Sequence, residues 1–531
     1  EGYGSIILAT PAILPAVAEM FADDIAWLAD LGSKETGKWG SDGFAIRQSG
    51  DDIYVIGNTS KGAMNGVYDL IEDNLGVLWI RADEENGLIY DELEEAAITK
   101  IDYREKSPFA IRGCQFGGDY ATGLMMTRNK CNTRFGLGFY TKFGGEPFTA
   151  GHTTLELLLT SPLYDPEETE YWETDEAGNC LWQEGSRQIN PWSEKAIDAM
   201  AASIIATMEA NPDIRCMCVG ELDNQGHGRN VPYDTEPFEY APGEFIDPTE
   251  YNFYSTVWHT MVNKIARKVR DAVPDGRVST FVLLCGSEPA ACEMEDNVMI
   301  CYTPVDQDMT VSMLDPSIDD RVTNRASLIH WKYIPQWVEK TSSAIFWVYY
   351  LCNYSGTEYS WPIWYTIQED LQGLAKLGVE GISSDGESDV QSESGWLNLD
   401  GPRGNCQNYW DMNELLCWLY QKLLWNPDED IPSLITYFCD KVYGGASPYM
   451  QEYYRLLEQG FNGFKESYKG ATTLTFHFSD FYKRCVKNQG IGHPLLDTLE
   501  QAYNAASGPV KDRILYIWDC VKFHMSSFRS F

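Results

Sequence analysis

The sequence predicts an α/β protein: a (β/α)8 TIM-type barrel that follows a small N-terminal α+β domain and precedes a helical C-terminal region. Three observations support this fold class. Apolar strand-like runs alternate with helical patterns between Phe109 and Ser384. Residues 53–80 have the pattern of a strand, a helix and a second strand. Beyond about residue 405 the sequence is helical and rich in aromatic residues. The predicted domains are 1–106, 107–404 and 405–531.

The N-terminal domain contains the clearest local pattern. Residues Ile53–Ile56 form a β-branched and aromatic run that stops at Gly57, which is typical of a strand followed by a turn. Apolar residues then recur at helical spacing, at Met64, Val67, Tyr68 and Ile71. Gly76 is expected to end this helix, and Val77–Ile80 to begin the next strand.

The barrel is expected to contain eight strands with helices between them. The candidate strands are 109–116, 131–140, 148–158, 214–220, 278–285, 298–303, 343–350 and 379–384. The helices expected between the later strands are 193–209, 251–273, 321–340 and 363–377. Pro335 should bend or break the third of these helices, because proline removes a backbone hydrogen bond. Eight strands over nearly 300 residues match the count of this barrel.

Composition excludes several classes of function. The 531-residue chain has a formal net charge of −39, which argues against binding to nucleic acid or to an anionic membrane. No apolar run reaches the roughly 18 residues that a membrane span needs. The 17 Trp and 31 Tyr suit stacking on sugar rings, although a large core also uses them.

The 14 cysteines include no C-x-x-C pair, so we expect mostly free, buried thiols rather than a disulfide scaffold. The chain starts at Glu1 without Met, which is consistent with a missing signal peptide or upstream domain. Its last residues, through Phe531, carry no C-capping signal and suggest a truncated helix.

Several further segments are similar, in order and spacing, to one family. They are Gly151–Gly178, Pro191–Asn224 with its terminal Asp-Asn pair, Leu423–Pro427 and Phe438–Ala446. Together they resemble proteins with the domain of unknown function 4838. The block at residues 53–79 also resembles the domain before the barrel in α-glucuronidases and family-20-type hexosaminidases. One departure is clear: Gln225–Asn230 replaces a cysteine cluster, so no role of those cysteines carries over.

The 4838 family largely coincides with glycoside hydrolase family 163. The resemblance therefore implies an endo-β-N-acetylglucosaminidase that cuts within the chitobiose core of N-glycans. It implies a glycan or glycoprotein substrate and a secreted or cell-envelope protein of a bacterium, with a cytoplasmic location left open. Two alternatives remain: an exo-acting hydrolase on an N-acetylated or acidic sugar, and a catalytically silent glycan-binding protein of the same fold.

Two pairs of acids follow predicted strands, where the active sites of such barrels lie. Glu221 and Asp223 follow the fourth strand, and Asp385 and Glu387 follow the eighth. Residues two apart on an extended chain face the same way, so each pair is expected to share a face. Glycoside hydrolysis needs a proton donor and a second group that stabilises the anomeric centre. If the sugar carries a 2-acetamido group, that group can attack, and an Asp then orients it. The alternative is that some of these acids are N-caps or solvated loop residues.

Other side chains at or near strand ends are candidates for substrate binding. They are His152, Arg112, Asn224, Tyr302, Trp347, Tyr349 and Trp396. Arg112 lies within an apolar strand, so a buried ion pair is an equal alternative for it. Barrel packing is the alternative for Trp347 and Tyr349, which share a face. No phosphate loop, dinucleotide fingerprint or HExxH motif is visible, so we expect neither a cofactor nor a metal.

Overall fold

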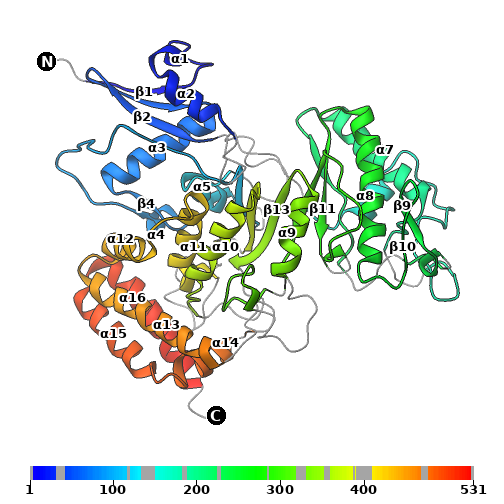
Figure 1. Ribbon diagram of the computed structural model, residues 1–531. Helices are drawn as coiled ribbons and strands as arrows, with labels where there is room; N and C mark the ends of the chain where they lie inside the picture. Colours follow the sequence, from blue (N-terminus) through cyan, green and yellow to red (C-terminus); the bar gives the residue numbers. More distant parts are fainter. Residues whose placement is uncertain are drawn as a thin grey trace.

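The computed structural model describes the chain outside residues 1–3, 32–41, 116–119, 133–149, 182–187, 224–228, 232, 284–285, 306, 318–329, 352–358, 387–388, 390–408, 468–475, 477 and 528–531. An N-terminal sheet, a central parallel sheet with helices, and a set of C-terminal helices follow one another along the chain (Figure 1).

The N-terminal sheet has the strand order β1-β3-β2-β6, with β1 parallel to β3 and the other pairs antiparallel. Its strands are β1 (Ile6–Ala9), β2 (Phe44–Ser49), β3 (Asp52–Gly57) and β6 (Tyr103–Glu105). The short helices α1 (Val17–Met20) and α2 (Ala22–Ala29) lie between β1 and β2 in sequence.

Helix α3 (Ser60–Leu75) confirms the helical pattern seen in the sequence. The Thr59 side chain caps it by accepting a hydrogen bond from the Gly62 amide, and Gly76 ends it with a left-handed φ of 65°. The strand expected after Gly76 is β4 (Leu78–Trp79). It is not part of the N-terminal sheet but pairs antiparallel with β5 (Leu88–Ile89). The short helix α4 (Glu84–Gly87) connects the two strands.

The central sheet is curled, and the structure describes six parallel strands in it, in the order β7-β14-β13-β12-β11-β8. They are β7 (Ile111–Gln115), β8 (Cys216–Cys218), β11 (Arg277–Val282), β12 (Val298–Tyr302), β13 (Ala344–Leu351) and β14 (Gly381–Gly386). These match six of the eight strands expected from the sequence and form a half-barrel.

The other two expected strands have different outcomes. The second, 131–140, lies outside the described residues beyond Asn132. The third, 148–158, is wrong over its described end, because α6 (Thr154–Leu159) is a helix. Leu155 and Leu158 are three residues apart there, which suits one side of a helix rather than a strand. A complete eight-stranded barrel stays a prediction.

Helices and one hairpin connect these strands. They are α5 (Tyr120–Arg128), α7 (Glu194–Ala210), η3 (Tyr233–Thr235), the hairpin β9 (Phe238–Ala241) and β10 (Glu244–Ile246), α8 (Phe253–Ala272), α9 (His330–Lys340) and α10 (Trp364–Lys376). Figure 1 shows α7, α8 and the hairpin as a lobe on one side of the sheet. Helix α9 continues through Pro335, so proline does not break it. Proline sits in the second turn, where it costs the helix a single hydrogen bond.

The two faces of the sheet separate two cores. The concave face buries a small cluster that includes Ile111, Phe281, Met299, Cys301 and Ile345. The opposite face packs against the helices in the main core. Successive side chains of a strand point to opposite faces of the sheet, so their order along each strand decides which of them reach the interior of the half-barrel.

The C-terminal region is helical, as the sequence predicts. Its elements are α11 (Trp410–Trp425), α12 (Ile431–Tyr443), η7 (Gly444–Ala446), α13 (Ser447–Ser467), α14 (Phe478–Asp480), η8 (Phe481–Lys487), α15 (Gly492–Ala505) and α16 (Gly508–Ser527). They carry a large share of the buried aromatic residues. The eleven described cysteines are free thiols, ten of them buried, in line with the expectation. Within the described part of the chain, no helix has the length and apolar character to cross a membrane.

His259 and Asp370 are titratable side chains that are fully buried against the central sheet and its helices. His259 on α8 bonds through Nδ1 to the Ser255 carbonyl oxygen at 2.8 Å, and burial lowers its pKa to about 4. Asp370 on α10 accepts hydrogen bonds from Gln307, Ser312, the Met313 amide and Tyr350, yet burial raises its pKa to about 6. The two residues therefore affect stability in opposite directions over the same acidic range.

For His259 the folded state favours the neutral ring, so its contribution is complete above the unfolded pKa of 6.5 and is lost as pH falls towards 4. The shift corresponds to about 3 kcal/mol. We expect the His259→Gln variant to be less stable than wild type at pH 7. The difference in the free energy of unfolding should shrink by about this amount as pH falls to about 4. Urea denaturation at several pH values measures it. The exposed His493→Gln is the control, and a deficit that is constant with pH for His259→Gln would contradict the assignment.

Candidate active site

The carboxyl ends of the parallel strands gather at one edge of the curled sheet, and Glu221 and Asp223 lie in the segment that follows β8 there. Glu221 is only 2% exposed, whereas Asp223 is exposed. Strand alternation does not extend to the two acids, because β8 ends at Cys218, so their shared face stays a prediction.

A close contact between two glycines positions this segment. The Gly220 carbonyl accepts hydrogen bonds from the amides of Thr153 and Thr154, at 3.0 and 3.2 Å. A Cβ on Gly220 would lie 1.9 Å from the Gly151 carbonyl oxygen, so the approach requires glycine. Gln188 donates to the Leu222 carbonyl at 2.9 Å and accepts from its amide at 3.3 Å. The backbone on both sides of Glu221 is thus held in place.

His152 lies against this segment. Its Nδ1 is 2.5 Å from the Glu221 carbonyl oxygen, which can only accept, so Nδ1 carries the hydrogen. In the neutral ring Nε2 is then an acceptor, and no described contact occupies it. The exposed ring can therefore accept a hydrogen bond from a sugar hydroxyl.

Phe281 of β11 joins His152 to Trp347 of β13. The His152 and Phe281 ring centroids are 5.2 Å apart, and those of Phe281 and Trp347 are 5.6 Å apart in an edge-on arrangement. Trp347 is partly exposed, and it packs against the concave-face cluster. The three rings form an aromatic row across the strand ends. Phe281 is 3% exposed, so only His152 and Trp347 present ring surface that a sugar could contact.

Asp385 and Tyr349 lie on the neighbouring strands. Asp385 is the penultimate residue of β14 and pairs with Gln115 of β7. It is partly exposed and accepts a hydrogen bond from the Gly386 amide. Tyr349 is 9% exposed and belongs to the main core. The register of β13 is irregular between Val348 and Leu351, so strand alternation does not extend from Trp347 to Tyr349, and their shared face stays a prediction. Asp385 is therefore at the same edge of the sheet as Glu221 and Asp223.

Two candidate residues are placed elsewhere. Arg112 is 1% exposed and forms an ion pair with Asp42 of the N-terminal domain at 2.5 Å, and it also donates to the carbonyls of Phe109 and Lys130. The buried ion pair, one of its two alternatives, is the observed one. Tyr302 is on the helix-facing side of β12, where its hydroxyl is 2.8 Å from Nδ1 of His330. Neither side chain lies on the concave face, because both occupy the opposite phase of strand alternation.

Glu387, Asn224 and Trp396 lie outside the described residues. Sequence analysis missed one residue of the site, Phe281, which contacts both His152 and Trp347. Phe281 could have been found from the alternation of the fifth strand.

Comparison with solved structures relates this fold to glycoside hydrolases. A GH138 enzyme targeting pectin rhamnogalacturonan II aligns over 99% of this chain and 85% of its own, with 12% identity and a TM-score of 0.56. CpGH89 from Clostridium perfringens, in complex with GlcNAc-alpha-1,4-galactose, aligns over 97% of this chain and 63% of its own, with 11% identity and a TM-score of 0.49. A beta-hexosaminidase of Streptomyces plicatus in complex with GlcNAc aligns over 84% of this chain and 91% of its own, with 11% identity and a TM-score of 0.39.

The first of these similarities shows that the chain has a fold used by glycoside hydrolases. Among curated proteins no sequence matches the chain. The family model for the domain of unknown function DUF4838 matches residues 84–455, which is well over half of the 531 residues, and the chain belongs to that family.

Proposed function

We propose that this chain is a glycoside hydrolase whose cleft lies at the carboxyl ends of the parallel strands. The observation that carries the proposal is that Asp223, Glu221 and Asp385 share this edge with the row His152–Phe281–Trp347. Carboxylates beside an aromatic surface are what glycosidic cleavage and pyranose binding need. Glu387, two residues beyond Asp385, is the further candidate for the proton donor.

The proposed substrate is an N-glycan, cut within its chitobiose core. The resemblance to glycoside hydrolase family 163 supports this specificity, with Asp223 orienting the 2-acetamido group and Glu221 or Glu387 protonating the leaving oxygen. A terminal acidic sugar is the second candidate, because the similar structure at TM-score 0.56 targets a pectin polysaccharide.

We expect the protein to release an intact oligosaccharide from an N-glycoprotein and to leave one N-acetylglucosamine on asparagine. The measurement is mass analysis of both products after incubation with high-mannose and complex glycoproteins. Single monosaccharides released from chain ends would favour the exo-acting enzyme. Binding to a glycan without any product would favour the silent binding protein.

Binding of a thiazoline inhibitor tests the mechanism. The inhibitor mimics the cyclised intermediate that forms when the 2-acetamido group attacks the anomeric carbon. It should bind at least 10²-fold more tightly than free N-acetylglucosamine, roughly the lower limit for transition-state analogues. Equal affinities for the two compounds would argue against participation of the acetamido group.

A further inference from the structure

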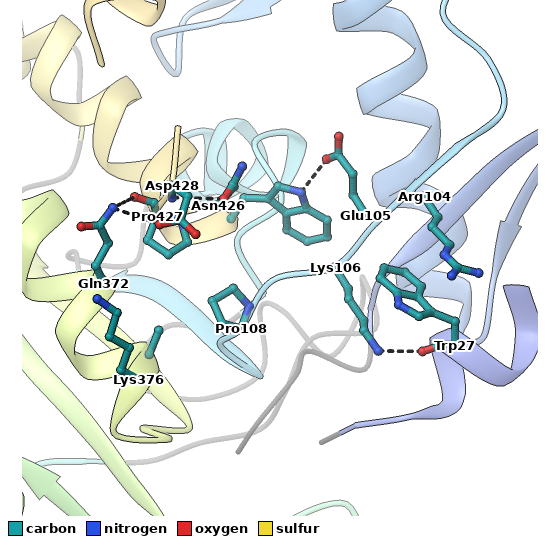
Figure 2. A pocket seen from close by; sticks show the side chains of 12 residues that line it. Trp27, Arg104, Glu105, Lys106, Pro108, Gln372, Lys376, Asn426, Pro427 and Asp428 are labelled. Atoms are coloured by element: carbon teal, nitrogen blue, oxygen red, sulfur yellow. Dashed lines mark hydrogen bonds between the residues drawn. The ribbon is translucent and has the colours of Figure 1, made fainter. Parts of the chain in front are cut away.

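A cavity lies at the opposite end of the central sheet from the candidate active site. Its lining comes from α2, from β6 and the linker that follows it, from the end of α10, and from the end of α11 and the residues after it. Pro108 directly precedes β7, and Lys376 on α10 precedes β14, so the cavity is at the amino ends of these strands (Figure 2). Its volume of about 590 Å³ is within the range of small-molecule sites.

Three cations line this cavity in a chain whose net charge is −39. Lys106 donates to the carbonyl oxygens of Trp27 and Asp30, at 2.6 and 2.7 Å, which directs its ammonium group along one wall. Arg104 lies over the Trp27 ring and pairs with Asp24. Lys376 is exposed at the far wall and has no ion pair within the described part of the chain.

The two carboxylates of the lining already accept hydrogen bonds from its own donors. Glu105 accepts from the Trp425 indole at 2.8 Å, and Asp428 accepts from Gln372 at 3.0 Å. Figure 2 shows both contacts on the wall of the cavity. Among the described residues, Lys376 is the lining cation for which no ion pair or hydrogen bond is found, so it is the group that we expect to meet an anionic ligand.

Trp27 and Pro108 contribute apolar rings to the lining. Trp27 is half-buried, with Lys106 Nζ 4.3 Å from its ring centroid, and Pro108 lies between the two lysines. An indole and a proline ring offer surfaces to the C–H face of a pyranose, while an ammonium group pairs with a carboxylate. This combination of surfaces suits a ligand that is both a sugar and an anion.

We propose that this cavity is an accessory binding site for a carboxylate-bearing sugar, a uronic acid unit whose acid group pairs with Lys376. The choice of a sugar over other small anions rests on the proposed glycoside hydrolase function. Because the cavity is at the opposite end of the strands, the site binds its ligand independently of catalysis. It would hold an acidic glycan on the enzyme while the carboxyl-terminal edge acts on another part.

Calorimetric titration of the full chain with digalacturonate tests the site. We expect Lys376→Gln to weaken binding at least tenfold, because it removes the charge that pairs with the carboxylate of the sugar. Lys376 is exposed, so its replacement leaves the fold intact. Lys483→Gln, an equal loss of charge at an exposed lysine of η8, should change affinity less than twofold. The neutral disaccharide cellobiose should bind at least tenfold more weakly than digalacturonate.

Three outcomes would overturn the proposal: no binding of digalacturonate, equal loss in both lysine variants, or displacement of the sugar by an equal concentration of inorganic phosphate. The Asp223→Asn variant should bind digalacturonate as wild type does, which separates this site from the catalytic edge. Hydrolysis of N-glycans without digalacturonate binding would refute this inference alone. Binding that depends on Lys376 without hydrolysis of any glycan would refute the proposed function alone.

Discussion

The Asp223→Asn variant is expected to lose roughly 10²–10³-fold in kcat while its thermal stability stays near that of wild type. Asp223 is exposed in the segment after β8, so its removal leaves no buried group unpaired. An amide cannot supply the negative charge that stabilises the transition state, although it has nearly the shape of the carboxylate. The measurement pairs kcat on the released glycan with the melting temperature.

Asp213→Asn is the matched control for this variant. Asp213 is an exposed aspartate in the turn before β8, at the other end of the same strand. It should keep full activity. A loss of stability with activity retained in Asp223→Asn would reassign Asp223 to a structural role. If Glu221→Gln is fully active, the role of proton donor moves to Glu387.

The Arg81→Leu variant is expected to lose about 3–5 kcal/mol of stability, because it would leave buried carboxylates without their cation. Arg81 is fully buried and bonds to Asp389 at 2.6 and 2.9 Å, to Asp411 at 2.9 Å and to Glu414 at 2.8 Å. Burial opposes its charge, but the attraction of these three carboxylates raises the pKa of Arg81 above its usual range.

This cluster connects distant parts of the chain. Arg81 follows β4, Asp389 follows β14, and Asp411 and Glu414 are on α11. Arg513 of α16 adds a second cation, 2.6 Å from Glu414. The midpoint of urea denaturation measures the loss. The partly exposed Arg47, which pairs with Asp24, is the control, and Arg47→Gln should cost about 1 kcal/mol or less. Equal losses of stability in the two variants would show that the buried cluster contributes no more to the free energy of unfolding than the Arg47–Asp24 pair does.

Periodicity in the sequence was enough to predict most helices and strands. The short apolar runs of β11, β12 and β13 and the helical period of α8 depend on neighbouring residues only, so local patterns are enough to predict them. The prediction was wrong at Thr154–Leu159, where a short apolar run is compatible with either a strand or a helix.

Pairings between distant residues could not be predicted this way. Arg112 has its carboxylate partner 70 residues upstream at Asp42, and Arg81 has one 308 residues downstream at Asp389. Charged side chains within apolar runs indicate that a partner exists, but only the packing of separate elements selects which one.

The sequence alone determined the alternation of strands and helices and the position of the acids after strand ends, because both follow from local order along the chain. Tertiary structure decided which side of the sheet each side chain occupies and which rings meet. Arg112 and Tyr302 face away from the concave side, whereas His152 and Trp347 meet through Phe281. The curl of the sheet brings strands far apart in sequence to one edge, and a local pattern contains no information about that closure.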